Sequence, residues 1–313
     1  MTDPYTRLLT LMDKAETQMQ KAFIQAIIDA KISIGTLEEI ERLMLNGQLD
    51  EAMSIVMQAS SDILVSAQIE TFVAAGIAGS KVISKAVEVV VGFDRVNDRA
   101  VKAIRENRLE LIRNFTEEQI KVTRQALVEG TERGLNPREQ ARNFRKSIGL
   151  TAHQQQAVYN YRKHLENMSY EALNRELRDK RFDRTVARSV ENKEPLSKTQ
   201  INKMVDRYRE RYIKYRSEVI ARTEALRGVH QGTEEAYAQA IDQGVLDPNK
   251  LIRKWIAARD ERTRVSHRKL NGDTAHFGEV FHGLNGDLRY PGDPLAPGSE
   301  TIQCRCSLTT RFL

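Results

Sequence analysis

The sequence predicts a mainly α protein, with an elongated helical body and a small, loop-rich α+β module at the C-terminal end. Through roughly the first 240 residues, apolar side chains recur at three- and four-residue steps, which is the spacing of amphipathic helices. From about residue 251 the pattern changes, because the last 63 residues hold six of the 17 glycines and three of the seven prolines. A chain of 313 residues is long enough to bury a substantial core.

Local signals place the ends of several helices. In a capping box, a Ser or Thr and a Glu or Gln three residues later bond the free backbone N–H groups of a helix start. The sequence contains this pattern at Thr36, Thr116, Thr151 and Ser197, and an Asn-Pro start at Asn136. Helices are predicted to end at Gly47, Gly134 and Gly244. In the module, Ile252–Ile256 is predicted to be a short strand, and Gly272, 283–286 and 291–297 to be turns.

Charge divides the chain into three segments. Residues 1–94 are an acidic helical region with 7 Lys and Arg against 13 Asp and Glu, 95–250 are the helical body, and 251–313 are the Cys-containing module. The body includes a long basic helix over 197–243, and residues 162–227 hold 18 Lys and Arg against 11 Asp and Glu. A basic stretch can meet nucleic acid or an acidic protein surface. The interspersed acids favour instead a solvated helix face with local ion pairs.

One face of the 197–243 helix carries an apolar and aromatic track. Its members follow a heptad-like spacing, with Arg222 as the single polar position: Ile201, Val205, Tyr208, Tyr212, Tyr215, Val219 and Leu226. Such a track buries a seam against a partner helix, in the same chain or in a neighbouring subunit. The tyrosines can instead be stacking platforms for single-stranded nucleic acid, although aromatic residues at helical spacing more often form a core.

No membrane segment or secretion signal is expected. The N-terminus lacks a basic stretch followed by an apolar run, and the most apolar segment, 72–93, is interrupted by Lys81, Lys85 and Glu88. The two cysteines, Cys304 and Cys306, are one residue apart, so a disulfide between them would be strained. A chain with no disulfide framework is typical of a reducing cytoplasm.

Three motifs within residues 215–308 are not explained by composition. The first is Ile220-Ala-Arg-Thr-Glu-Ala-Leu-Arg227, followed on the same helix by His230, Gly232 and Tyr237. The second is Lys254-Trp255 with Asp260-Glu-Arg-Thr-Arg-Val-Ser-His267. The third is Pro291-Gly-Asp-Pro294 with Ile302-Gln-Cys-Arg-Cys306.

In this order and spacing, the motifs resemble the phage Mu F-like head morphogenesis family. That family carries an Ala-Arg-Thr-Glu helix, a Trp followed by Asp-x-Arg-Thr-Arg-x-x-His, and a closing Asn-Cys-Arg-Cys. Gln303 stands where the family usually has Asn. The positions that carry the family motif here are Arg222, Thr223, Glu224, Trp255, Asp260, Arg262, Thr263, Arg264, His267, Asp293, Cys304, Arg305 and Cys306.

The resemblance implies a minor head or minor capsid protein of a tailed phage. Such a protein acts in prohead assembly near the portal vertex and takes part in genome delivery. Its partners would be the portal protein and the major capsid or scaffolding protein, with self-association and DNA as further options and no membrane. It would be found in the prohead or virion, and in the host cytoplasm during assembly.

The motif residues can act in two ways. Buried arginines need paired carboxylates, so Asp260, Glu224, Asp273 and Asp293 are expected to pair with Arg222, Arg262 and Arg305 in a network that pins the module. Alternatively, Cys304 and Cys306 with His267 offer ligands for zinc, and His276 and His282 offer further imidazoles. Cys-x-Cys is tighter than the usual zinc-ligand spacing, so the network is the favoured interpretation and no cofactor is predicted.

Two other classes of function compete with the head-protein interpretation. A DNA-contacting protein, packaged or ejected with the genome, would use the basic helices of 162–227. An enzyme in the C-terminal module would use His267, Glu224 and Asp260 for acid–base chemistry. The sequence contains no phosphate-binding glycine loop, nucleophile elbow or metalloprotease helix motif, so no enzymatic activity is expected.

Overall fold

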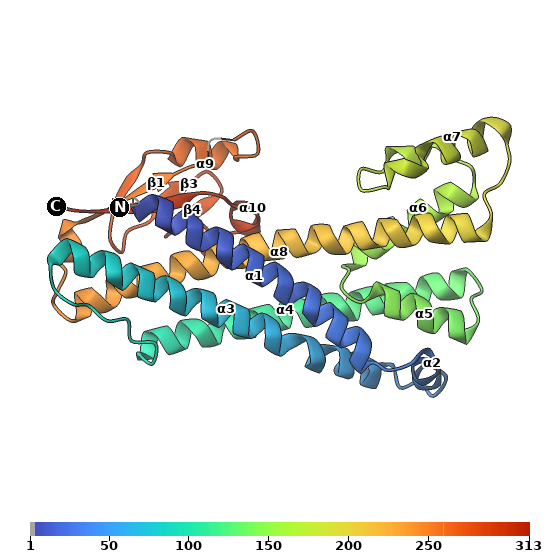
Figure 1. Cartoon of the computed structure of the whole chain (residues 1–313), viewed down its shortest axis with the longest axis horizontal. Coiled ribbons are helices and arrows are strands. Elements are labelled where there is room, and N and C mark those ends of the chain that lie inside the picture. The colour runs from blue at the N-terminus through green and yellow to red at the C-terminus, as the bar shows by residue number, and fades with distance from the viewer. Residues whose placement is uncertain (1–3, 259) are drawn as a thin grey trace. The chain divides into compact units, whose positions relative to one another are not determined.

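The computed structural model describes residues 4–258 and 260–313 and confirms a mainly α fold with a small α+β C-terminal module (Figure 1). The α-helices are α1 Pro4–Ser33, α2 Leu37–Leu45, α3 Leu49–Val87, α4 Asp98–Glu132, α5 Pro137–Ser147, α6 Ala152–Glu166, α7 Asp183–Asn192, α8 Lys198–Asp242, α9 Val265–Leu270 and α10 Gly298–Thr301. The 3₁₀ helices are η1 Tyr170–Asn174, η2 Lys180–Phe182 and η3 Pro248–Lys250. The strands are β1 Leu251–Ile256, β2 Thr274–His276, β3 Phe281–Gly283, β4 Gly286–Leu288 and β5 Ser307–Phe312.

The chain forms two compact units, and each is assembled from separate stretches of sequence. Unit 1 contains residues 1–23, 63–111 and 218–313, and unit 2 contains residues 24–62 and 112–217. These units are not the consecutive segments 1–94, 95–250 and 251–313 that charge and composition distinguish. Composition marks where the chain changes character, whereas packing groups helices that are distant in sequence.

Most of the predicted helix starts are confirmed. Thr36, Asn136 and Thr151 each form a complete capping box with the residue three positions later. At the start of α8, the backbone N–H of Gln200 donates to Oγ of Ser197, and the backbone N–H of Ser197 donates to Oε1 of Gln200. The predicted start at Thr116 is wrong, because α4 continues through this position without a break. No Gly or Pro lies between the start of α4 at Asp98 and Thr116, so nothing ends the helix before this position.

In unit 2, the tyrosine track of α8 is core only at its beginning. Tyr208 is 2% exposed, and its ring centroid lies 4.5 Å from that of Tyr161 on α6. The continuation of the track to Tyr215 is wrong, since this side chain is 44% exposed while Arg216 and Ser217 are buried. At this level the buried face of α8 is formed by the two residues that follow Tyr215, so a strict seven-residue track misses it. Because Tyr208 is covered by protein, it cannot serve as a stacking platform for bases.

In unit 1, the C-terminal half of α3 packs closely against α8 (Figure 1). Gly228 lies against Thr71, and Gly232 lies against the backbone of Phe72. By length and composition, Asp62–Val87 of α3 is apolar enough to cross a membrane, the one such helix among the described residues, although half of its apolar window is buried in protein. Core residues on this part of α3 include Ala75, whose neighbours are Ala225 and Val229 of α8.

Gly232→Ala is expected to destabilise unit 1 by about 1–3 kcal/mol, because the helices touch where a methyl group would go. A Cβ at Gly232 would lie 2.2 Å from the carbonyl oxygen of Phe72, and a backbone atom cannot move as a flexible side chain does. Urea denaturation would measure the loss. Gly92→Ala is the matched control, since no described atom lies within 4 Å of a Cβ built there. Equal stability of the two variants would contradict the close approach.

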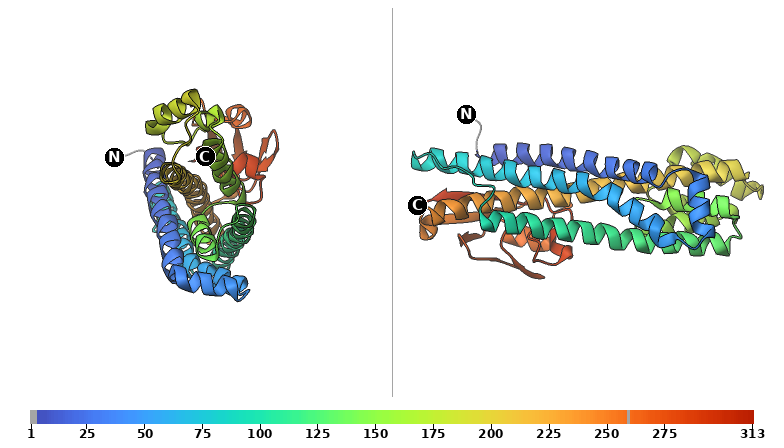
Figure 2. Two further views of the ribbon diagram at one scale, coloured as in Figure 1. Left: turned by 90° about the vertical axis from the view of Figure 1, so that its right-hand side faces the viewer. Right: turned by 90° about the horizontal axis from the view of Figure 1, so that it is seen from below.

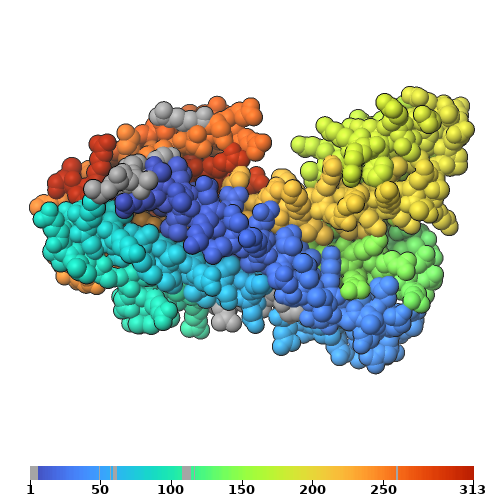
Figure 3. Space-filling view, viewed as in Figure 1, coloured from blue at the N-terminus to red at the C-terminus, as the bar shows by residue number. Residues whose placement is uncertain are grey.

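The C-terminal module is built on a three-stranded antiparallel sheet in the order β2-β1-β5, with β3 and β4 as a separate hairpin. Confirming the predicted strand, Leu251–Ile256 alternates between buried and half-buried side chains. The strands lie beside the C-terminal part of α8 in both views of Figure 2. On the face drawn in Figure 3, the blue N-terminal part of α1 borders the orange and red module, and Met12 packs against the module core.

Candidate functional site

Two of the sequence motifs meet in the core of the module. Helix α9 carries His267, and the segment between α10 and β5 carries Cys304 and Cys306. Nδ1 of His267 lies 3.4 Å from Sγ of Cys304 and 3.3 Å from Sγ of Cys306. The three side chains are 1–2% exposed. One ring nitrogen therefore faces two thiols in a site closed to solvent.

The other nitrogen of His267 faces a carboxylate that the sequence motifs did not include. Nε2 lies 2.8 Å from Oε2 of Glu300, whose side chain is fully buried. Glu300 accepts hydrogen bonds from the hydroxyl of Ser266 and from the amide of Asn285. A glutamate in the short helix α10 carries no sequence signal for this role, so only the folded structure reveals it.

The two thiols have opposite pKa shifts. Their mutual hydrogen bond lowers the pKa of Cys306 and raises the pKa of Cys304 above its ordinary value. Burial raises the pKa of both groups, and the hydrogen bond from His267 adds to the lowering at Cys306. Cys306 is therefore the thiol that ionises first, with its negative charge next to the imidazole.

The residue before the cysteines ties the first motif to the third. Gln303 has a left-handed backbone with φ of 57°, and its N–H donates to Oγ1 of Thr223 on α8 at 3.0 Å. Only glycine visits this region routinely, and Asn tolerates it better than longer side chains do. The conformation gives a physical reason for the family's usual Asn at this position.

Gln303→Asn is expected to stabilise unit 1 by a few tenths to about 1 kcal/mol, because Asn is less strained in the left-handed region. Thermal or urea unfolding would detect the gain. Gln243→Asn provides a comparison at a helix end where the described backbone has no positive φ. An equal or larger gain in the comparison variant would argue against the strain at Gln303.

A second polar cluster joins the Asp-x-Arg-Thr turn to the Cys-Arg-Cys segment. As predicted, Asp260 pairs with Arg305. The carboxylate also accepts from the hydroxyl of Thr263 at 2.9 Å, and this bond is the main reason that the pKa of Asp260 is lowered. Arg264 donates to the carbonyl oxygen of Ile302. These bonds fix the loop that follows β1 against the last segment of the chain.

The remaining predicted pairings are different in the structure. Arg222 pairs with Glu16 on α1, at 2.7 Å, because the fold of unit 1 brings that helix to α8. Asp293 accepts two bonds from the side chain of Arg289, and Arg262 is exposed. The buried Glu224 accepts from Gln68 of α3 at 2.9 Å and from Arg227, and Asp273 is exposed. Sequence proximity could not identify partners that come from the N-terminal helices.

Arg253 on β1 is the most heavily bonded cation that sequence reasoning missed. It is 1% exposed, and it donates to the carboxylate of Glu234 at 3.0 Å and to the carbonyl oxygens of His276, Glu279 and Arg289. Burial raises the pKa of Glu234 to about 7, against the opposing attraction of Arg253. A guanidinium in the middle of a strand thus holds the two loops that flank β3 and β4.

The other predicted imidazoles do not reach the His267 cluster. His276 is exposed on β2, and His282 is exposed on β3, where Nδ1 lies 2.8 Å from Oδ1 of Asp287. The interpretation of His276 and His282 as further ligands is therefore wrong, because both side chains point to solvent. The described residues contain one cluster with metal-ligand spacing, formed by His267, Cys304 and Cys306.

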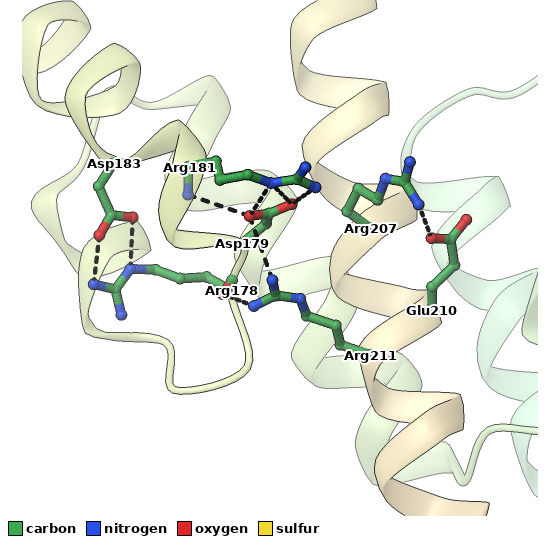
Figure 4. Close-up of polar contacts among 7 residues, drawn as sticks. All are labelled: Arg178, Asp179, Arg181, Asp183, Arg207, Glu210 and Arg211. Atoms are coloured by element: carbon green, nitrogen blue, oxygen red, sulfur yellow. Dashed lines mark hydrogen bonds and ion pairs between the residues drawn. The ribbon is translucent and has the colours of Figure 1, made fainter.

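Within unit 2, part of the basic stretch is paired with neighbouring acids. Figure 4 shows a set of ion pairs among Arg178, Asp179, Arg181, Asp183, Arg207, Glu210 and Arg211. Asp179 lies between two arginines, and the hydrogen bond from Arg181 lowers its pKa to about 2. This arrangement is the solvated, locally paired helix surface that the interspersed acids favour.

Comparison with known proteins gives one family match and one curated relative. Residues 121–309 match the family described as Phage Mu protein F like protein. The chain is also 32% identical over 92 residues to the NAD(+)--arginine ADP-ribosyltransferase EFV of Enterococcus faecalis, a match that covers 28% of this chain and 17% of that protein. No solved structure matches. Because the family match covers more than half of the sequence and includes the clustered residues, the chain belongs to the phage Mu F-like family of head morphogenesis proteins.

Proposed function

We propose that this chain is a minor structural protein of a tailed-phage head, acting in prohead assembly near the portal vertex and in genome delivery. Beyond family membership, the proposal is supported mainly by the role of the motif residues, many of which bind one another inside unit 1. Gln303 bonds Thr223, Arg305 bonds Asp260, and His267 contacts both cysteines. Residues used in this way hold the module together, which is the role expected of them in a structural protein. Its partners in the proposal are the portal protein and the major capsid or scaffolding protein.

Co-sedimentation from phage-infected cells tests this function. The tagged full chain is expected to migrate with portal and capsid proteins at the density of proheads, and to stay near the top of the gradient in uninfected cells. His282→Gln, an exposed change, serves as a matched control and should migrate like the wild type. A chain that stays at the top of the gradient in infected cells would contradict a role in head assembly. For genome delivery, the chain should leave the capsid together with the DNA on triggered ejection.

An enzymatic function is the strongest competitor, because Cys306, His267 and Glu300 lie in the order of a thiol nucleophile, a base and an orienting carboxylate. However, both thiols are at most 2% exposed. Unit 1 contains a cavity of about 820 Å³ lined by α1, α3, α8, β1 and β5, and neither the thiols nor His267 line it. We therefore expect no transfer of ADP-ribose from labelled NAD to arginine by this chain, although its curated relative is named for that reaction.

A gel-shift titration with duplex DNA at increasing salt concentration tests the alternative that the protein contacts DNA. Binding through phosphates falls steeply as salt rises, since counterions are released. With Arg178, Arg181, Arg207 and Arg211 paired as in Figure 4, we expect no binding of duplex DNA even at low salt. Salt-dependent binding that is weakened by Arg207→Gln would instead support the DNA-contacting interpretation.

A further inference from the structure

We propose that His267, Cys304 and Cys306 bind a zinc ion, with Glu300 as the carboxylate that orients the histidine. Zinc prefers thiolate sulfur and imidazole nitrogen, and two thiols and one imidazole are the groups that converge here. Their ligand atoms all lie within 4.8 Å of one another, and all three residues are buried. The proposed ion would stabilise the module, which goes beyond the role in head assembly and does not depend on it.

The distances fit a common metal ion. With Zn–S near 2.3 Å and Zn–N near 2.05 Å, two ligand atoms of a tetrahedral site are about 3.6 Å apart. Nδ1 of His267 lies 3.4 Å from one sulfur and 3.3 Å from the other. Each of these two distances would have to open by only about 0.2–0.3 Å to match a zinc site. Both sulfurs lie at nearly the same distance from Nδ1, as the ligands of a shared ion would.

Glu300 sets the orientation that a zinc ligand needs. Metal-binding histidines usually donate their second ring N–H to a carboxylate, which fixes the tautomer and directs the other nitrogen at the metal. In the zinc-bound form proposed here, the N–H at Nε2 of His267 would donate to Glu300, whose Oε2 lies 2.8 Å from Nε2, and Nδ1 would present its lone pair to the ion beside the two sulfurs. Glu300 is itself held by Ser266 and Asn285, which leaves little freedom for the carboxylate to move away.

The surrounding module also fits a structural ion. The cluster joins α9 to the segment before β5, two parts of the chain that are 37 residues apart at His267 and Cys304. Much of this region consists of turns and short strands, and small modules of this kind gain folding free energy from a bound metal. The negative charges of two buried thiolates would also be balanced by a divalent cation. With three protein ligands, the fourth position would be held by one water molecule enclosed with the ion.

Metal content of the full-length protein tests the assignment. After purification and desalting, elemental analysis is expected to find one zinc per chain. After removal of that zinc, titration with CoCl2 should produce the sulfur-to-cobalt charge-transfer bands of a tetrahedral thiolate site. His267→Gln, Cys304→Ser and Cys306→Ser should each abolish these bands, while the exposed His282→Gln should retain them. Glu300→Gln keeps all three ligands and should weaken zinc binding by about 10- to 100-fold.

The cobalt titration of the wild-type chain tests zinc binding even if a variant fails to fold. The proposal would be overturned if folded wild-type chain, checked by circular dichroism, gave no cobalt bands and took up no zinc from ZnCl2. It would equally fail if the two cysteines were recovered as a disulfide after purification with a reducing agent, or if His282→Gln lost the bands as fully as His267→Gln.

Discussion

Replacement of Arg253 by methionine is expected to lower the free energy of unfolding of unit 1 by roughly 3–5 kcal/mol, the usual cost of breaking a buried ion pair from one side. The change leaves the carboxylate of Glu234 without the 3.0 Å bond that it has in the native structure. It also removes the donor to three backbone carbonyls in the loops around β3 and β4. Unsatisfied buried acceptors add to the loss of the ion pair.

Urea denaturation followed by tryptophan fluorescence measures this effect, because the single tryptophan, Trp255, lies two residues further along the same strand. Lys254→Met is the matched control, since it removes a positive charge from the neighbouring position, which is only half-buried. The variant Arg253→Met/Glu234→Leu should recover part of the lost stability, as it removes the carboxylate that would be left unpaired. If Arg253→Met were no less stable than Lys254→Met, the guanidinium would have no such role.

Trp255→Ala is expected to cost about 3–5 kcal/mol, because a fully buried indole leaves a cavity that the sheet cannot close. Trp255 is 0% exposed, and its ring lies edge-on to Phe281 at 5.3 Å and to His267 at 5.4 Å between centroids. Its loss would therefore also loosen the histidine that faces the two thiols. Circular dichroism during thermal unfolding would report the change, since this variant has no tryptophan fluorescence.

Leu295→Ala is the control for Trp255→Ala, because it removes an apolar side chain from the surface of the module instead of from its core. Leu295 is 80% exposed in the same module, and surface substitutions usually stay within about 0.5 kcal/mol. Trp255→Phe should retain part of the packing and lie between the wild type and Trp255→Ala. A Trp255→Ala variant with the stability of Leu295→Ala would show that the module core does not depend on the indole.

The helix starts show which part of the fold was predictable. Gly35, Gly134, Gly149 and Pro195 lie one or two residues before the confirmed starts at Thr36, Asn136, Thr151 and Ser197. Thr116 has the same capping pattern without a preceding breaker, and α4 runs through it. Capping energy of about 1 kcal/mol stabilises a helix end once one exists, but it does not interrupt a helix. A breaker followed by a cap is therefore the stronger signal.

Sequence alone could predict only those residues of the candidate site that belong to rare residue types. Cysteine and histidine are rare in this sequence, so His267, Cys304 and Cys306 could be singled out as a group, and the structure brings them together. Glu300 and Arg253 could not be recognised among 43 acidic and 49 basic residues, because only burial distinguishes them. The partner of Arg222 was missed for a related reason: Glu16 is 206 positions away in sequence.

Because unit 1 is built from separate stretches of sequence, its folding is delayed while the chain is being synthesised. Its segments end at residue 111 and resume at residue 218, so at about 5–20 residues per second the ribosome takes roughly 5–20 s to cross the interval. Unit 2 has been fully translated by residue 217. During this time the α8 residues that pack against Phe72 and Ala75 of α3 have not yet been translated. The apolar half of α3 thus has no α8 surface to pack against until the last third of the chain has been translated.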